Sequence, residues 1–167
     1  QVRLAGFSNV NVDLMSALPG QTLSSWEKTL KKVTMLRPEH ISAYSLIIEE
    51  GTPFYERYGR GEKAFPPLPD EDTEREMYHM TKTILEEHGY HRYEISNYAR
   101  KGFDCRHNTG YWTGVDYLGL GIGAASCISG FRFKKEGNLN TYLEMASRKD
   151  FPSCIYQDIQ KLSVREQ

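Results

Sequence analysis

Four side chains that could bind a flat ligand lie within a single short stretch, at His107, Asn108, Tyr111 and Trp112. An imidazole nitrogen can ligate a metal or a haem iron, and the phenol and indole rings could stack on a macrocycle. The same side chains could instead stabilise a loop, with the two polar groups bonded to loop carbonyls and the two rings buried. For an arbitrary protein this structural explanation is the more frequent one. Because Thr109-Gly110 interrupts the stretch, we expect a loop rather than a helix.

Alternating glycines follow, at Gly119, Gly121 and Gly123, and Ala124 completes the spacing of a dinucleotide-binding loop. That loop must open a helix, whereas residues 125–131 read as strand and turn, and no well-placed acid closes a later strand. A Rossmann site is therefore disfavoured. We interpret the glycines as positions where the backbone lies close to a ligand or a helix, within a last strand of the sheet.

The carboxylate of Asp13 is a third candidate. It lies in an alternating segment, residues 8–15, with Val10, Val12 and Leu14 on one face and Asn11, Asp13 and Met15 on the other. If the apolar face packs against helices, Asp13 faces the inner side of the sheet, where a carboxylate needs a partner. A diol such as a ribose could donate two hydrogen bonds to it, and neighbouring loop amides could do so equally well.

The elements that must position these residues alternate between strand and helix. Strands are expected at 8–15, 40–49, 90–98 and 115–120, with helices from Ser24 to the stop at Pro38 and from Asp70 or Asp72 to about residue 88. A short helical turn is expected near residues 54–58, a hairpin at 126–133 with Ser129-Gly130 as its turn, and a last helix capped by Asn138 or Asn140.

This order predicts a parallel α/β sheet, either small and open or the later part of a barrel. Ligands in such folds bind at the carboxyl ends of the strands.

Composition excludes several classes of function. A formal net charge of −1 gives no strong attraction to nucleic acid or anionic membranes. The sequence contains no apolar run of the roughly 20 residues that a membrane helix needs. Cys105, Cys127 and Cys154 are far apart and odd in number, which suits a reducing cytoplasm better than a disulfide framework. No CxxC or CxxxCxxC occurs, so a zinc site is disfavoured, and no nucleophile elbow suggests acyl transfer.

Both ends of the chain read as interrupted. The first residues resemble the last turn of a helix that Gly6 stops, and Ser163 could cap a helix that has barely begun. We therefore expect a fragment of a longer protein.

Five motifs, in register, resemble those of a known family. They are residues 11–22 (NVDLMSALPGQT), 38–44 (PEHISAY), 49–54 (EEGTPF), 93–99 (YEISNYA) and 107–112 (HNTGYW). Over almost its whole length the chain resembles the oxygen-independent coproporphyrinogen III oxidase-like radical S-adenosylmethionine proteins, the HemN/HemW family. The last two motifs resemble the HemW branch, which is associated with haem binding and delivery.

The resemblance implies the later strands of a radical-SAM partial (β/α)6 TIM-like barrel. It implies that residues 1–125 belong to the barrel, that residues 126–148 form a closing hairpin and helix, and that residues 149–167 link to a further C-terminal domain. It also implies a [4Fe-4S] cluster on CxxxCxxC, a motif that this chain lacks, and bound S-adenosylmethionine. No metal ligand is therefore assigned within the chain.

Motif matching suggests individual site residues. Asp13 corresponds to the family's cofactor-contacting acid, and Met15 lies beside it. Ile47 and Ala125 lie near further positions that contact S-adenosylmethionine, although the motif diverges around Ile47. For haem, the resemblance makes His107 the leading candidate, together with Asn108, Tyr111 and Trp112.

The function implied is part of a HemW-like protein that binds the cluster, S-adenosylmethionine and haem and passes haem to accepting proteins. One alternative is an oxygen-independent coproporphyrinogen III oxidase that decarboxylates propionates in porphyrin biosynthesis. A second is a stand-alone porphyrin-binding module. The chain by itself is expected to lack radical chemistry, with no catalytic residue assigned, and to self-associate or be marginally stable because a severed parallel sheet exposes an unpaired edge.

Overall fold

The computed structural model describes residues 1–59, 65–147 and 156–162. The chain divides into two compact units, Gln1–Cys105 and Arg106–Gln167, and each is described by itself. The division lies earlier in the chain than the predicted boundary at residue 125. The assignment of residues 106–125 to a barrel remains a prediction.

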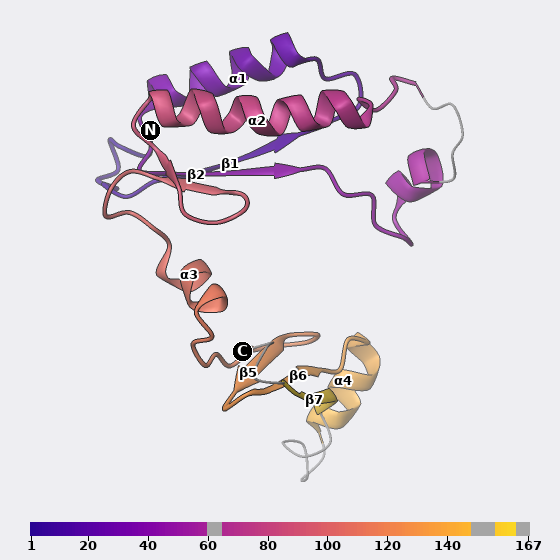
Figure 1. Ribbon diagram of the computed structural model, residues 1–167. Coiled ribbons are helices and arrows are strands. Elements are labelled where there is room, and N and C mark those ends of the chain that lie inside the picture. The colour runs from indigo at the N-terminus through magenta and orange to yellow at the C-terminus, as the bar shows by residue number, and fades with distance from the viewer. Residues whose placement is uncertain (60–64, 148–155, 163–167) are drawn as a thin grey trace. The chain divides into compact units, whose positions relative to one another are not determined.

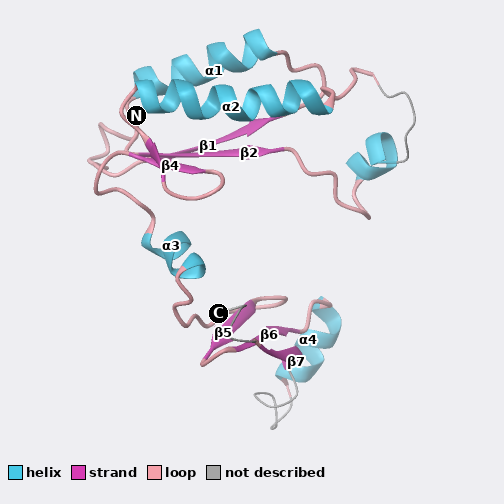
Figure 2. Cartoon of the chain, in the orientation of Figure 1, coloured by secondary structure: helices cyan, strands magenta, loops and turns pink. Residues whose placement is uncertain are grey.

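The first unit is a four-stranded sheet with two long helices (Figure 2). Its elements are β1 (Asn11–Ser16), α1 (Leu23–Leu36), β2 (His40–Ser45), the short π-helix η1 (Tyr55–Gly59), α2 (Glu71–Glu87), β3 (His91–Arg92) and β4 (Asn97–Ala99). The strand order is β1-β2-β4-β3. The helical turn expected near residues 54–58 is confirmed by η1.

The sheet is mixed rather than wholly parallel. β1 and β2 pair in parallel, as predicted, but β4 runs antiparallel to both β2 and β3. The single strand predicted at 90–98 is wrong, because a bend separates β3 from β4 and reverses the chain. The carboxylate of Glu94 holds this bend by accepting from the backbone N–H of Ser96 at 2.8 Å and from the side-chain amide of Asn97.

Both long helices lie on one side of β1 and β2 (Figure 1). Between the helices and the sheet lies an apolar core of Trp26, Leu30, Val33, Ile41, Met77, Ile84, Leu85, Tyr90 and Tyr98. Burial of such side chains stabilises the fold by about 1.5–3 kcal/mol each. Val12 and Leu14 pack against this core from β1. The other face of the sheet carries no helix from the described part of this unit.

Local sequence fixes the ends of the two helices. Thr22, not Ser24, caps α1: its hydroxyl accepts from the Ser25 N–H at 3.2 Å, and the Ser25 hydroxyl accepts from the Thr22 N–H at 2.9 Å. The start predicted at Ser24 was wrong by one residue, because this reciprocal pair starts the helix at Leu23. Asp70 caps α2 as predicted, by accepting from the Thr73 N–H at 2.8 Å.

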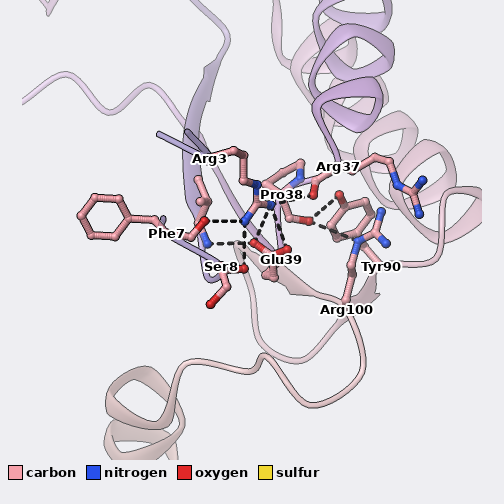
Figure 3. Close-up of polar contacts among 9 residues, drawn as sticks. Arg3, Phe7, Ser8, Arg37, Pro38, Glu39, Tyr90 and Arg100 are labelled. Carbon is pink, nitrogen blue, oxygen red and sulfur yellow. Dashed lines mark hydrogen bonds and ion pairs between the residues drawn. The ribbon is translucent and has the colours of Figure 1, made fainter. Parts of the chain in front are cut away.

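Polar contacts attach the first residues to the turn before β2 (Figure 3). The Arg3 guanidinium donates to both carboxylate oxygens of Glu39, at 2.8 Å each. From the other side, the carbonyl of Pro38 accepts from the Tyr90 hydroxyl at 2.8 Å and from Nε of Arg100 at 3.2 Å. These contacts fix the position at which β2 begins.

The helical turn predicted before Gly6 is confirmed. Gly6 has a φ of 89°, its N–H donates to the Arg3 carbonyl at 3.1 Å, and the Phe7 N–H donates to the Val2 carbonyl at 3.4 Å. This is the Schellman pattern that ends a helix. The helix start predicted at Ser163 lies outside the described residues.

The second unit comprises α3 (Arg106–Trp112), β5 (Ala125–Ile128), β6 (Phe131–Lys135), α4 (Leu139–Ala146) and β7 (Tyr156–Lys161). Its strands form an antiparallel sheet in the order β5-β6-β7. The predicted hairpin is confirmed, with positive φ at Ser129 and Gly130, 52° and 77°, as tight hairpin turns require. Asn138 caps α4 by accepting from the Thr141 N–H at 3.1 Å.

Two expectations for this unit were wrong. Residues 106–112 form helix α3 rather than a loop. Residues 115–120 form no strand of the sheet and contribute only an isolated bridge between Tyr117 and Cys127. Within the stretch predicted as a linker, residues 156–161 form β7, and the role of residues 149–167 as a link to a further domain stays a prediction.

Among the described residues, no helix combines the length and apolar character needed to cross a membrane.

Candidate functional site

Asp13 lies on the face of the sheet opposite the helices, as predicted. Val12 and Leu14 are partly buried against the core, whereas Asn11, Asp13 and Met15 alternate with them and are exposed. The parallel register sets Ser42 beside Asp13 and Tyr44 beside Met15. This open face therefore presents a carboxylate between polar and apolar neighbours.

A series of hydrogen bonds that the sequence did not reveal connects Asp13 to side chains further along the sheet. Oδ1 of Asp13 accepts from Nδ2 of Asn11 at 2.7 Å. Oδ1 of Asn11 lies 2.7 Å from Nδ1 of His40, and Nε2 of His40 lies 2.7 Å from the Tyr93 hydroxyl. His40 is only 6% exposed, so these contacts are its main replacement for water.

Burial lowers the pKa of His40, since it disfavours the imidazolium. The negative charges of Asp13, Asp104 and Glu94 act in the opposite direction but only partly offset burial. The net shift is downward, so the ring is neutral at pH 7. A neutral ring donates through one nitrogen and accepts through the other.

One buried acceptor on this face has no donor. Asn97 lies opposite Ser42 across β2 and β4, and its side-chain amide nitrogen donates to Glu94. Its Oδ1 is buried and has no hydrogen-bond partner among the described residues. Leaving such an atom unpaired is costly. Asp13, Ser42 and Asn97 thus form a row across three strands, and of these three side chains only that of Asp13 is exposed.

Ile47 lies in a different environment from Asp13. It follows β2, is 72% exposed, and lines a cleft of about 660 Å³ between the carboxyl end of β2 and α2. That volume falls within the range of small-molecule sites, about 300–1,000 Å³. Glu74, Tyr78 and Thr81 of α2 also line the cleft. Asp13 and Met15 do not line it, so this unit does not bring the three predicted cofactor residues into one pocket.

In the second unit, α3 changes how the predicted haem residues are arranged. Helical spacing sets His107 beside Tyr111 and Asn108 on the same face as Trp112. The rings of His107 and Tyr111 meet edge to face, with centroids 4.7 Å apart, and Tyr111 meets Tyr117 in the same way at 4.6 Å.

The His107 ring is free to act as a ligand. It is exposed, and within the described part of the chain its nitrogens make no hydrogen bond. Trp112 is 60% exposed. The adjoining cavity, lined by Tyr111, Tyr117 and Cys127 among others, holds only about 130 Å³. A macrocycle cannot enter so small a cavity, so a ligand on this helix must lie across its exposed surface.

The glycines before Ala125 allow the backbone conformation and the close backbone contact of the loop in which they lie. A Cβ on Gly119 would lie 2.2 Å from the carbonyl oxygen of Ala125, so the close neighbour expected there is the chain's own backbone. Gly121 and Gly123 have positive φ, 95° and 66°. The segment then enters β5 rather than a helix, in keeping with the disfavoured Rossmann site. The predicted last strand begins only at Ala125, which is exposed.

The three cysteines in the sequence do not have the CxxxCxxC spacing that an iron–sulfur cluster of this family requires. Cys105 and Cys127 are free and belong to separate units, and Cys154 lies outside the described residues. Over the described ranges, no group of three or more His, Cys, Asp or Glu side chains is arranged to hold a metal ion.

No family model matches the sequence, but individual relatives do. The chain is 39% identical over all 167 of its residues to a heme chaperone HemW from Bacillus subtilis, of which it covers 42%. It is 39% identical over 146 residues to a HemW from Lactococcus lactis, covering 87% of this chain and 38% of that protein. It is also 41% identical over 151 residues to the mitochondrial radical S-adenosyl methionine domain-containing protein 1 of Danio rerio, covering 90% of this chain and 32% of that one. The chain thus spans less than half the length of these relatives.

Among solved structures, coproporphyrinogen III oxidase (HemN) from Escherichia coli, a radical SAM enzyme, matches with a TM-score of 0.72. The match covers 96% of this chain and 38% of that one at 24% identity, so it bears on fold alone. It confirms the predicted fold class, the later part of a radical-SAM TIM-like barrel. Five motifs in register, this fold and relatives near 39% identity lead to one conclusion. The chain belongs to the HemN/HemW family of radical S-adenosylmethionine proteins.

Proposed function

We propose that this protein is a haem chaperone of the HemW type and that α3 is its haem-binding surface. The observation that carries the proposal is the exposed imidazole of His107, whose nitrogens make no hydrogen bond among the described residues. The Tyr111 ring holds this imidazole edge to face, and the exposed indole of Trp112 adds an apolar surface. Imidazole is a common axial ligand of haem iron, and exposed rings can stack on a porphyrin.

We further propose that Asp13, Met15, Ile47 and Ala125 contact S-adenosylmethionine. The first two lie on the open sheet face, where Asp13 can accept hydrogen bonds from ribose hydroxyls. When bound, this cofactor supplies radical chemistry only together with a cluster. The cysteines in the sequence lack the spacing that this cluster requires. In this proposal Asp13 binds and orients its ligand.

The partners that follow are haem and haem-accepting proteins. Relatives named heme chaperone support this part of the proposal. A cytoplasmic location is proposed because Cys105 and Cys127 are free thiols, as a reducing compartment maintains them. The proposal includes no nucleic-acid partner, because the formal net charge is −1.

Two assays of the full-length protein, one of haem transfer and one of oxidase activity, distinguish the proposed chaperone function from that of a coproporphyrinogen III oxidase. The full-length protein is loaded with haemin and mixed with apomyoglobin, and separately incubated anaerobically with coproporphyrinogen III, S-adenosylmethionine and a reductant. The chaperone proposal predicts haem transfer without protoporphyrinogen formation. Formation of protoporphyrinogen without stable haem binding would establish the oxidase instead. A reading frame without CxxxCxxC upstream of this segment would favour the porphyrin-binding module.

A further inference from the structure

The hydrogen bonds between Asp13 and Tyr93 have a fixed direction. A carboxylate offers only acceptors, so the group of Asn11 that lies 2.7 Å from Oδ1 of Asp13 must be its NH2. The amide oxygen of Asn11 therefore points away from Asp13, toward His40 and Ser42. The Ser42 hydroxyl donates to that same oxygen at 3.3 Å.

This orientation decides the tautomer of His40. Because Asn11 presents an oxygen 2.7 Å from Nδ1, that nitrogen must carry the proton. In a neutral ring Nε2 is then an acceptor, and the Tyr93 hydroxyl donates to it at 2.7 Å. The Tyr93 oxygen in turn accepts, weakly, from the Cys105 N–H at 3.4 Å. In this series of hydrogen bonds, from Tyr93 through His40 and Asn11, each donor is directed toward Asp13.

The inner part of this series of hydrogen bonds is buried, and its outer end at Asp13 is exposed. His40 is 6% exposed, and its ring also contacts Tyr93 edge to face with centroids 5.6 Å apart. Asp13, by contrast, is exposed, and its Oδ2 makes no hydrogen bond within the described part of the chain. One carboxylate oxygen is thus fixed by the protein and the other is available to a ligand.

We propose that Tyr93, His40 and Asn11 form a positioning relay that holds the Asp13 carboxylate in one orientation for a ligand with vicinal hydroxyls. The inference rests on the proposed contact between Asp13 and S-adenosylmethionine, whose ribose is such a ligand. The relay residues do not touch the ligand themselves. A fixed carboxylate accepts two hydroxyl donors without first losing rotational freedom, so the relay favours ribose over a sugar that lacks one hydroxyl.

The first test reads the relay directly in the full-length protein at pH 7. Long-range ¹H–¹⁵N spectra of the histidine rings, assigned with His40→Asn, report which nitrogen is protonated. We expect Nδ1–H with an unprotonated Nε2. In Tyr93→Phe, which removes the donor to Nε2 together with the weak acceptor of the Cys105 N–H, we expect the population to move toward Nε2–H. An Nε2–H ring or a charged ring in the wild type would overturn the relay, as would an unchanged spectrum in Tyr93→Phe.

The second test measures whether His40 positions Asp13, by comparing the affinities for two ligands that differ in one ribose hydroxyl. Affinities for S-adenosylhomocysteine and its 2′-deoxy analogue are compared in wild type, Asp13→Asn, His40→Leu and His40→Asn. We expect His40→Leu to lose about tenfold in preference for the ribose form, as Asp13→Asn does. His40→Asn should recover part of that preference, because its amide can still donate toward Asn11. Equal weakening of both ligands in His40→Leu would reduce His40 to a structural residue and overturn the proposal.

The two tests separate this inference from the proposed function. If Asp13→Asn leaves both affinities unchanged, the proposed cofactor contact fails, while the tautomer measurement still decides whether the relay exists. If Asp13→Asn weakens ribose binding but both His40 variants match wild type, the cofactor contact stands and the relay falls.

Discussion

The indole N–H of Trp26 donates a hydrogen bond of 2.9 Å to the hydroxyl of Thr81 and so joins α1 to α2 inside the core. The Thr81 hydroxyl in turn donates a hydrogen bond to the Met77 carbonyl at 2.7 Å. Both polar groups are buried, and the Thr81 hydroxyl is the acceptor that satisfies the Trp26 N–H. The helices that support the sheet are thus joined by a polar contact as well as by apolar packing.

Replacing Thr81 by valine should destabilise the first unit. The change keeps the shape of the side chain but leaves the Trp26 N–H buried without an acceptor, at a cost of about 1–3 kcal/mol. Urea unfolding followed by tryptophan fluorescence measures the loss. Thr83→Val on the exposed side of the same helix is the matched control and should change stability little. Equal effects of the two variants would contradict the importance assigned to the Trp26 contact.

The Arg3–Glu39 pair should make stability depend on pH. Burial opposes ionisation of Glu39, but hydrogen bonds from Arg3 and from the Val10 N–H outweigh it and lower the pKa of this carboxyl. A folded-state pKa below the unfolded value of about 4.3 stabilises the protein above that pH, and the contribution is lost as pH falls through the folded value.

The advantage of wild type over Glu39→Gln should therefore be full near neutral pH and shrink as the solution is acidified. Urea unfolding of both proteins at a series of pH values measures it. Glu76→Gln, an exposed change on α2, should show no such trend. A constant difference between wild type and Glu39→Gln would refute this linkage.

Gly119→Ala should disrupt the loop that leads into β5. The added Cβ would lie 2.2 Å from the Ala125 carbonyl oxygen and 2.9 Å from the Ala124 Cβ, so backbone must move. The expected cost is about 1–3 kcal/mol. Gly137→Ala is the control, because nothing lies within 4 Å of its Cβ and its φ is not positive. The rate of limited proteolysis of the second unit is compared between Gly119→Ala and Gly137→Ala. Similar rates would contradict the close approach of Gly119 to the Ala125 carbonyl oxygen.

The 167-residue chain by itself is predicted to self-associate. β1 is an outer strand of its sheet, and its free edge is paired with no described strand. The adjoining sheet face exposes Met15 and Tyr44, at 46% and 42%. Unpaired edges of this kind recruit other chains. Sedimentation at several concentrations measures the association, and a monomer of high thermal stability would contradict the prediction.

Features set by a few neighbouring residues were predictable from the sequence. The alternation of Asn11 to Met15 gave the right face for Asp13, Asp70 gave the start of α2, and Ser129-Gly130 gave the hairpin turn. Each depends on local backbone preferences or on period-two alternation, which sequence displays directly.

Other features, some fixed by local contacts and one by a distant contact, were not predictable from the sequence pattern. A glycine penalty of about 1 kcal/mol at Gly110 argued against a helix, yet α3 forms, and the Val115 N–H bonds to the Gly110 carbonyl at 2.9 Å just beyond its end. The reversal into β4 depends on the carboxylate of Glu94. The contact between Asn11 and His40 requires the register of β1 on β2, which no local pattern encodes.

Haemin titration of the full-length protein tests the proposed haem site most directly. The Soret band is followed for wild type, His107→Ala and His79→Ala. The control is matched, because His79 is also an exposed helical histidine whose ring meets a tyrosine edge to face, that of Tyr78. We predict that His107→Ala shifts the Soret maximum and weakens binding, while His79→Ala behaves as wild type. An unchanged spectrum and affinity in His107→Ala would remove His107 as the haem ligand and, with it, α3 as the binding surface.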